Sequence, residues 1–232
     1  MGDLQPRSET RIRIPVDGER STSGVLLTPG AGGKRTVVIV AHGAGNDMNT
    51  PLITSFAEGL CAAGYPALRF NFLYKEEGRS APDRQEVLVR TWGAVFAHAR
   101  QLLAGKVDSW VAAGKSMGGR VASQMVAEGL LPVDGLIFLG YPLHPANDMG
   151  RLRDSHLYMI EVPMLFFAGT RDPLCSLPLL KGVLERLRAP REILTIEGGD
   201  HSFHVPKSLH RQEEEIFAEI TATAVEWIGR LK

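Results

Sequence analysis

The sequence has few cysteines and no long apolar run. Its two cysteines, Cys61 and Cys175, do not make the disulfide framework that stabilises small secreted proteins. The longest apolar runs, 36–41 and 136–140, are far shorter than the ~20 residues that a membrane-spanning helix requires. Residues 1–6 lack the basic region and apolar stretch of a secretory signal peptide. These absences predict a cytoplasmic protein of a reducing compartment that does not bind membranes.

An excess of either charge is also missing, because 26 lysines and arginines balance 26 aspartates and glutamates. A neutral chain lacks the overall positive field that general binding to nucleic acids or anionic membranes requires. At 232 residues, with 44% hydrophobic residues, the chain is long enough for one large core. We therefore expect a single domain over residues 1–232, no nucleic-acid partner and a small-molecule substrate. The oligomeric state is left open.

What the sequence does contain is a regular alternation of short β-branched runs with longer helical patterns, separated by glycine or proline. Two strands close together, followed by repeated strand–helix units, are typical of an α/β domain with a mostly parallel sheet. The central runs are apolar on both faces, as in strands covered by helices on both sides. The expected strands are residues 10–16, 24–28, 36–41, 66–71, 109–113, 135–139, 163–168 and 192–196, and the expected helices are 50–63, 83–104, 117–128, 178–188 and 209–231.

The connecting segments are short. Residues 141–162 offer room for a loop and a short helix only, so we expect an eight-stranded sheet without a large lid. Gly129 follows the third expected helix, where a helix-ending glycine is typical. The last helix has an apolar stripe at 3.6-residue spacing, and residues 213–215, all glutamate, are expected on its solvated face.

The sharpest motif is residues 114–118, Gly-Lys-Ser-Met-Gly, which follows one expected strand directly and precedes a helix. Gly-x-Ser-x-Gly in this context is typical of a nucleophile elbow. The flanking glycines allow a tight turn on which Ser116 stands in a strained conformation with its hydroxyl exposed above the sheet. The free N–H groups of the following helix favour a developing anion at the same place. We therefore expect Ser116 to be a catalytic nucleophile.

The same residues resemble the end of a phosphate-binding P-loop, in which Gly-Lys-Ser closes a glycine-rich loop. That motif requires another glycine five residues before Gly114, and this position is Ser109. Residues 110–113 are also predicted as strand rather than loop. The nucleotide-binding alternative is therefore rejected.

A nucleophilic serine needs a base, and the base needs an acid that orients it. Asp172 follows the expected strand 163–168, and His201 follows the expected strand 192–196. Both therefore lie at the carboxyl edge of the sheet, as Ser116 does. The chain order Ser, Asp, His is one of the known orders of this triad. We expect Ser116, Asp172 and His201 to form a catalytic triad.

The oxyanion of an acyl-transfer reaction needs two N–H donors. One is expected to be the backbone N–H of Met117, the residue after the nucleophile. The other is expected from the loop after the third strand, with Ala44 as first choice and Gly43 as second. His42, in the same loop, is interpreted as a structural residue that holds the loop by hydrogen bonds.

Other polar residues near strand ends carry weaker signals. The spacing of His201 and His204 suits a metal, but no cysteine or acidic cluster accompanies them, so we expect neither a metal nor a cofactor. Lys115 either attracts an acidic substrate or is simply solvated. Candidates for lining the substrate pocket are His42, His144, Tyr141, Lys115 and Asn71, with Arg69 and Arg79 as rim residues.

Taken together, these motifs resemble the α/β-hydrolase superfamily. More narrowly, the chain is similar to the small cap-less branch related to dienelactone hydrolases, and within it to the testis-expressed hydrolase-like group. The resemblance implies an α/β-hydrolase fold and a serine hydrolase, with Ser116 where dienelactone hydrolases proper have cysteine. It rests on residues 42–45, 69–72, 81–84, 114–119, 140–145, 169–173 and 199–203.

Three functions follow from these residues. The first is a cofactor-independent serine hydrolase of carboxylic esters or thioesters that works through an acyl-enzyme. The second is a hydrolase of small peptides or other amides, since the same triad cleaves both bonds. The third is a non-catalytic scaffold that keeps the fold, whose expected mark is loss of a triad residue or of the glycines around Ser116. Neither is lost.

Overall fold

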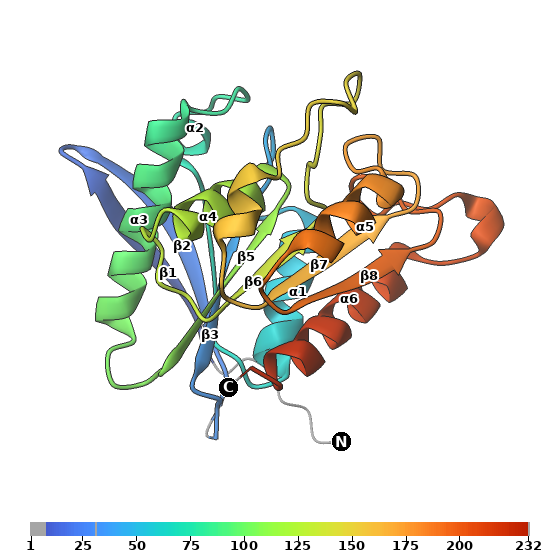
Figure 1. Cartoon of the computed structure of the whole chain (residues 1–232). Helices are drawn as coiled ribbons and strands as arrows, with labels where there is room; N and C mark the ends of the chain where they lie inside the picture. Colours follow the sequence, from blue (N-terminus) through green and yellow to red (C-terminus); the bar gives the residue numbers. More distant parts are fainter. Residues whose placement is uncertain (1–7, 31, 232) are drawn as a thin grey trace.

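The computed structural model describes residues 8–30 and 32–231, which form one β-sheet covered by helices on both faces (Figure 1). Residues 1–6, on which the signal-peptide argument rests, lie outside the described residues. Within 8–30 and 32–231, no helix has both the length and the apolar composition needed to cross a membrane.

All eight expected strands are present, with boundaries that differ from the prediction by a few residues. The sheet order is β1-β2-β4-β3-β5-β6-β7-β8. The first two strands form an antiparallel hairpin, the second is antiparallel to the fourth, and the remaining neighbours are parallel. The strands are β1 (Ser8–Asp17), β2 (Arg20–Thr28), β3 (Thr36–Ala41), β4 (Ala67–Phe70), β5 (Ser109–Lys115), β6 (Gly135–Leu139), β7 (Met164–Gly169) and β8 (Arg191–Ile196).

The five expected helices are also present, and Gly129 ends the third with a φ of 72°. The prediction missed a one-turn helix at 73–76 and a 3₁₀ turn at 207–209, because so short a segment has no hydrophobic period. A second 3₁₀ turn, at 155–159, lies in the segment where a short helix was expected. The last helix begins four residues later than expected because Gln212 and Glu215 form a capping box there. The helices are α1 (Pro51–Ala62), α2 (Leu73–Glu76), α3 (Gln85–Leu102), α4 (Met117–Ala127), α5 (Leu177–Arg186) and α6 (Glu213–Ile228), and the 3₁₀ turns are η1 (Ser155–Met159) and η2 (Lys207–Leu209).

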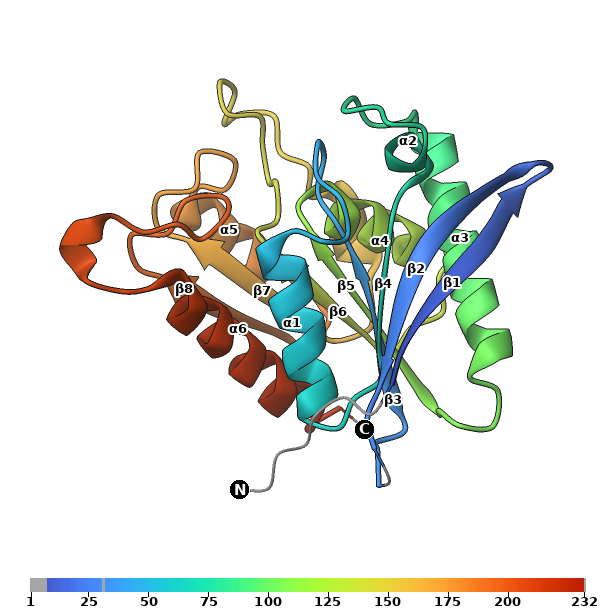
Figure 2. The ribbon, with the colours of Figure 1, turned by 180° about the vertical axis from the view of Figure 1, so that it is seen from behind.

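The helices form two layers, with α3, α4 and α5 on one face of the sheet and α1 and α6 on the other (Figure 1, Figure 2). The first three helices share one buried hydrophobic cluster, to which they contribute Trp92, Val121 and Leu180. The other two helices share a second buried hydrophobic cluster, to which they contribute Phe56 and Ile220. Alternate residues of β3 belong to the two clusters, which explains why the central strands are apolar on both faces.

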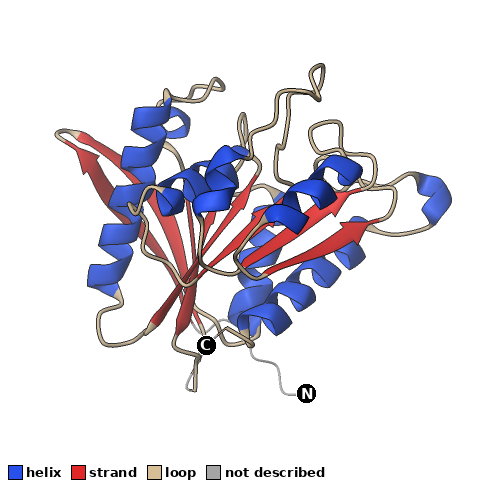
Figure 3. Cartoon of the chain, viewed as in Figure 1, coloured by secondary structure: helices blue, strands red, loops and turns tan. Residues whose placement is uncertain are grey.

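The loops that follow the parallel strands meet at one edge of the sheet (Figure 3). β3 has β4 on one side and β5 on the other, so the strand order reverses here. In α/β sheets, ligands bind in the crevice outside the carboxyl ends of the strands at such a reversal. Between β6 and β7 the only helical segment is the 5-residue turn η1, which confirms the expected absence of a large lid.

Candidate active site

Ser116 occupies the sharp turn between β5 and α4. Its φ of 50° and ψ of −113° lie outside the conformations that residues with a side chain favour. Close packing requires the neighbouring glycines. A Cβ at Gly114 would overlap the backbone N of Gly119, and a Cβ at Gly118 would lie 2.6 Å from the carbonyl oxygen of His42. The turn therefore has the strained geometry of a nucleophile elbow, and Ser116 remains half-buried and accessible.

The structure brings Ser116, His201 and Asp172 together. Oγ of Ser116 lies 2.8 Å from Nε2 of His201. Nδ1 of His201 lies 2.7 Å from Oδ2 of Asp172, whose side chain is fully buried. Because a carboxylate can only accept, Nδ1 of His201 carries the proton and Nε2 accepts from the Ser116 hydroxyl. Three residues that follow three different strands therefore form one chain of hydrogen bonds.

Backbone contacts hold the acid loop against the base loop. The second carboxylate oxygen of Asp172 accepts from the N–H of Leu174 at 2.7 Å. The N–H of Arg171 donates to the carbonyl of Gly199 at 2.8 Å. A Cβ at Gly169 would overlap that same carbonyl, so the approach of the two loops requires glycine. The sequence analysis included Gly169 in the motif 169–173 but assigned it no role of its own.

The loop after β3 lies against the elbow. A Cβ at Gly43 would lie 3.5 Å from Cβ of Ser116. Within the part of the chain that the structure describes, the backbone N–H groups of Gly43, Ala44 and Met117 donate to no protein acceptor. These N–H groups remain available to an oxygen atom of a substrate.

His42 holds this loop in place. It donates from Nδ1 to the carbonyl of Gly43 at 2.8 Å and accepts at Nε2 from the N–H of Phe72 at 3.0 Å. The hydroxyl of Tyr74 donates to the same Gly43 carbonyl at 3.2 Å. Burial lowers the pKa of His42 to about 4, so the ring stays neutral and keeps both bonds at neutral pH. These hydrogen bonds are of the kind expected from the sequence, where His42 was interpreted as a residue that holds the loop.

Residues in β4 and directly after it anchor the far end of the same loop. The side chain of Asn71 accepts from the N–H of Met48 at 2.9 Å and donates to Glu76 at 2.9 Å. Arg69 donates to the carbonyl of Met48 at 3.3 Å and to the side chain of Asn49 at 2.5 Å. Asn71 therefore positions the loop rather than presenting its amide to an open pocket. Sequence reasoning missed the part played by Glu76, which lies in the unpredicted helix α2.

Two further pocket candidates also bond to neighbouring loops. His144 is 1% exposed, donates to the carbonyl of Pro145 and accepts from the N–H of Ser176. Tyr141 is 1% exposed and donates to the carbonyl of Arg153 at 2.6 Å. Burial raises the pKa of the Tyr141 hydroxyl, so it remains a donor. Both side chains therefore hold loops together through hydrogen bonds to backbone groups.

The histidine pair considered for metal binding is separated by its partners. Nδ1 of His204 lies 3.4 Å from the carboxylate of Asp200, and its Nε2 lies 3.0 Å from that of Glu213. His201 is bonded to Ser116 and Asp172 instead. Across residues 8–30 and 32–231, no three histidine, cysteine or acidic side chains are grouped as metal ligands.

Lys115, the residue before the elbow serine, is only 6% exposed, so the interpretation that it is simply solvated is wrong. Its Cγ lies 3.3 Å from the place of a Cβ at Gly43, and its Nζ lies 3.3 Å from the place of a Cβ at Gly140. The side chain therefore fills the space beside these two glycines. Burial lowers the pKa of Lys115 to about 8, although the carboxylates of Asp172 and Asp200 oppose this effect.

The burial of Lys115 predicts a pH-dependent stability. Between its folded pKa of about 8 and its ordinary value of 10.5, the unfolded chain binds more protons, so raising the pH favours the folded state. Over this window the free energy of unfolding should rise by about 3 kcal/mol in wild type relative to Lys115→Met. Urea unfolding of both proteins from about pH 7 to about pH 10 measures this difference in the free energy of unfolding. Lys115→Met should be the more stable protein at neutral pH and lose this advantage at high pH; parallel curves would contradict the prediction.

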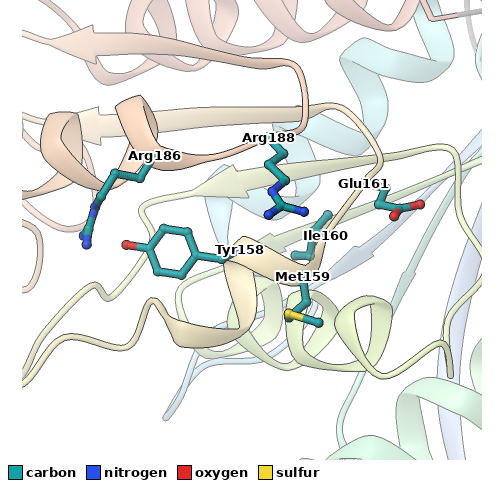
Figure 4. A pocket seen from close by; sticks show the side chains of 6 residues that line it. All are labelled: Tyr158, Met159, Ile160, Glu161, Arg186 and Arg188. Atoms are coloured by element: carbon teal, nitrogen blue, oxygen red, sulfur yellow. The ribbon is translucent and has the colours of Figure 1, made fainter.

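A cavity of about 460 Å³ lies between η1 and the end of α5 (Figure 4). Among its lining residues, Tyr158 and Glu161 precede β7, and Arg186 and Arg188 precede β8. These are the amino ends of the strands, whereas Ser116 follows a carboxyl end. The cavity is therefore separate from the candidate active site.

Comparison with solved structures shows the same fold. The chain is similar to a dienelactone hydrolase from Anabaena variabilis, with 22% identity, a TM-score of 0.74, and coverage of 97% of this chain and 98% of that chain. A lid-less α/β serine hydrolase from Xanthomonas campestris has 20% identity, a TM-score of 0.73 and coverage of 97% and 98%. Est1E from Butyrivibrio proteoclasticus, with ferulic acid bound, has 16% identity, a TM-score of 0.74 and coverage of 94% and 100%.

Sequence comparison identifies the family. The family model of an alpha/beta hydrolase domain matches residues 34–229. This match includes strands β3 to β8 and the loops that carry Ser116, Asp172 and His201. The sheet topology and the short β6–β7 connection agree with the expected branch without a cap. The chain therefore belongs to the α/β-hydrolase domain family, in its cap-less branch, and is a hydrolase.

Proposed function

We propose that this hydrolase cleaves carboxylic esters or thioesters with Ser116 as its nucleophile. The observation that carries the proposal is the chain of two short hydrogen bonds from Ser116 through His201 to the buried carboxylate of Asp172. A hydroxyl, an imidazole and a carboxylate in this order perform acyl transfer. The substrate's acyl group is transferred first to Ser116 and then to water.

Each residue of the proposed triad has a separate task. His201 removes the proton of Ser116 as Oγ attacks the carbonyl carbon, and then gives that proton to the leaving alcohol or thiol. Water, deprotonated by the same Nε2, attacks the acyl-enzyme and releases the acid. Asp172 keeps the proton of the neutral imidazole on Nδ1 and stabilises the imidazolium that forms in both steps.

The tetrahedral intermediate needs donors for its oxyanion. We assign the N–H of Met117 and one N–H of the loop after β3, from Ala44 or Gly43, to this task. These groups have no protein acceptor in the described chain, and the loop lies directly against Ser116. Each such donor contributes about 2.7–4 kcal/mol to transition-state stabilisation in comparable enzymes.

The surroundings of Ser116 favour small or exposed acyl groups. Ser116 is half-buried, and the connection between β6 and β7 contains no cap domain. Two of the similar structures are a dienelactone hydrolase and Est1E with bound ferulic acid, whose names point to ester and carboxylic-acid ligands. Amide hydrolysis is the alternative. Rates on an ester and an anilide of the same acyl group separate the two, and we expect the ester to react much faster.

The test of this function is covalent labelling with a serine-directed fluorophosphonate, followed by intact-mass analysis. Wild type and the exposed control Ser80→Ala should each gain one adduct. Ser116→Ala should gain no adduct. His201→Ala should react far more slowly than wild type, because the Ser116 hydroxyl then has no base to remove its proton. Absence of an adduct on folded wild type would contradict an assembled triad and favour the scaffold alternative.

A further inference from the structure

Outside the active site, the guanidinium of Arg69 on β4 is the least satisfied group of the described chain. The residue is 5% exposed, and its Nε is buried without a hydrogen-bond partner. Its bonds go to Met48 and Asn49, which are neutral. Burial lowers its pKa, although the carboxylates of Glu9, Glu58 and Asp47 oppose this effect. A buried cation without a counter-ion is costly, so an anion beside it would stabilise the folded state.

Arg69 lines a cavity of about 370 Å³ next to these groups. The cavity is formed by β1, β2 and β4 and by the end of the loop after β3. Figure 2 shows these strands at one end of the sheet. Arg11 and Arg13 also line the cavity, and Glu9 is the single carboxylate among the lining residues. Arg13 is paired with Glu76 at 3.6 Å, so the positive charge left for a ligand comes from Arg69 and Arg11. The cavity is therefore basic, although the whole chain is neutral.

The strand register places two of these arginines on one row. Arg11 of β1 pairs with Val25 of β2, and Val25 pairs with Arg69 of β4. Residues directly opposite each other on antiparallel strands point to the same face. Arg11 and Arg69 therefore flank Val25 on one face of the sheet, and their long side chains can reach a common ligand above it.

We propose that this cavity binds a small organic oxyanion between Arg69 and Arg11. The planar N–H groups of arginine match the oxygen atoms of a carboxylate or phosphate group. Val25 and Met48 supply an apolar wall for a short carbon chain, and the volume suits a small molecule. The site is separate from the triad, because its residues come from other strands and from the far end of the loop after β3. It does not depend on the esterase proposal.

Thermal unfolding with added salts tests the proposal. The full-length protein is heated with sodium butyrate, sodium phosphate or sodium chloride at equal ionic strength, and calorimetric titration then gives Kd. Butyrate, phosphate or both should raise Tm in a saturable way, because a ligand that binds only the folded state stabilises it. The two arms show which head group is preferred. Equal effects of all three salts would reduce the result to ionic screening and overturn the proposal.

Variants identify the site and exclude binding at the oxyanion donors near Ser116. Arg69→Met should abolish the saturable effect. Arg11→Gln should raise Kd about threefold, and Glu9→Gln should lower it about twofold, because one removes attraction and the other removes repulsion. Arg151→Gln, at another exposed arginine, should change nothing. If Arg69→Met does not fold, the opposite changes in Kd of Arg11→Gln and Glu9→Gln still show whether the anion binds in this cavity. Weaker binding in Glu9→Gln, or no change in either variant, would overturn the proposal.

Discussion

Replacement of Ser116 by alanine is expected to lower kcat for an activated ester by about a millionfold. The change removes the attacking oxygen, and only the oxyanion donors and substrate binding remain to accelerate the reaction. Folding should be preserved, because alanine replaces a single half-buried hydroxyl whose hydrogen bond goes to His201. Steady-state rates on a p-nitrophenyl ester, with Ser80→Ala as control and unfolding curves for each protein, measure the effect.

His201→Ala should cost nearly as much as Ser116→Ala, and the double variant should be no slower than either single one. The two side chains work through one hydrogen bond of 2.8 Å. Without His201 the serine has no base, and without Ser116 the histidine has no nucleophile to deprotonate. If the losses multiplied in the double variant, the two residues would act independently. That result would contradict the proposed mechanism.

Asp172→Asn is expected to lower kcat by about 10⁴-fold while the protein stays folded. One carboxylate oxygen of Asp172 accepts from the N–H of Leu174, so the amide oxygen of asparagine must take this place. The amide nitrogen then faces Nδ1 of His201 and donates to it. The imidazole is forced to carry its proton on Nε2, directed at Ser116, and cannot act as a base.

Two measurements test this reversal. The rate loss comes from kcat on the same ester, and the protonated nitrogen of His201 comes from ¹⁵N chemical shifts in wild type and Asp172→Asn. We expect the proton on Nδ1 in wild type and on Nε2 in the variant. A loss of less than about tenfold, or an unchanged tautomer, would show that Asp172 does not orient the base.

Much of the fold was predictable because it depends on local patterns. The elbow at Ser116 combines a strand, two glycines and a helix within a short stretch, and each part has its own signature. The positions of Asp172 and His201 follow from a general property of parallel sheets, whose carboxyl ends share one edge. Short elements such as α2 were missed because a single helical turn shows no hydrophobic period.

The candidate pocket residues could not be assigned in the same way. His144 and Tyr141 follow a strand end, and position alone does not distinguish a residue that meets a substrate from one that holds a loop. Their roles depend on which backbone groups of other loops lie within hydrogen-bond distance. These groups are far away in the sequence, so no local pattern reports them.

The sequence by itself determined the α/β architecture, the elbow and the three residues expected to perform the chemistry. Tertiary structure decided the burial of Lys115, the anchoring of the loop after β3 by Asn71, and the placement of Arg69 and Arg11 on either side of Val25. The physical reason is range. Strand and turn preferences act between neighbours in the chain, whereas burial and strand register arise only when distant segments pack together.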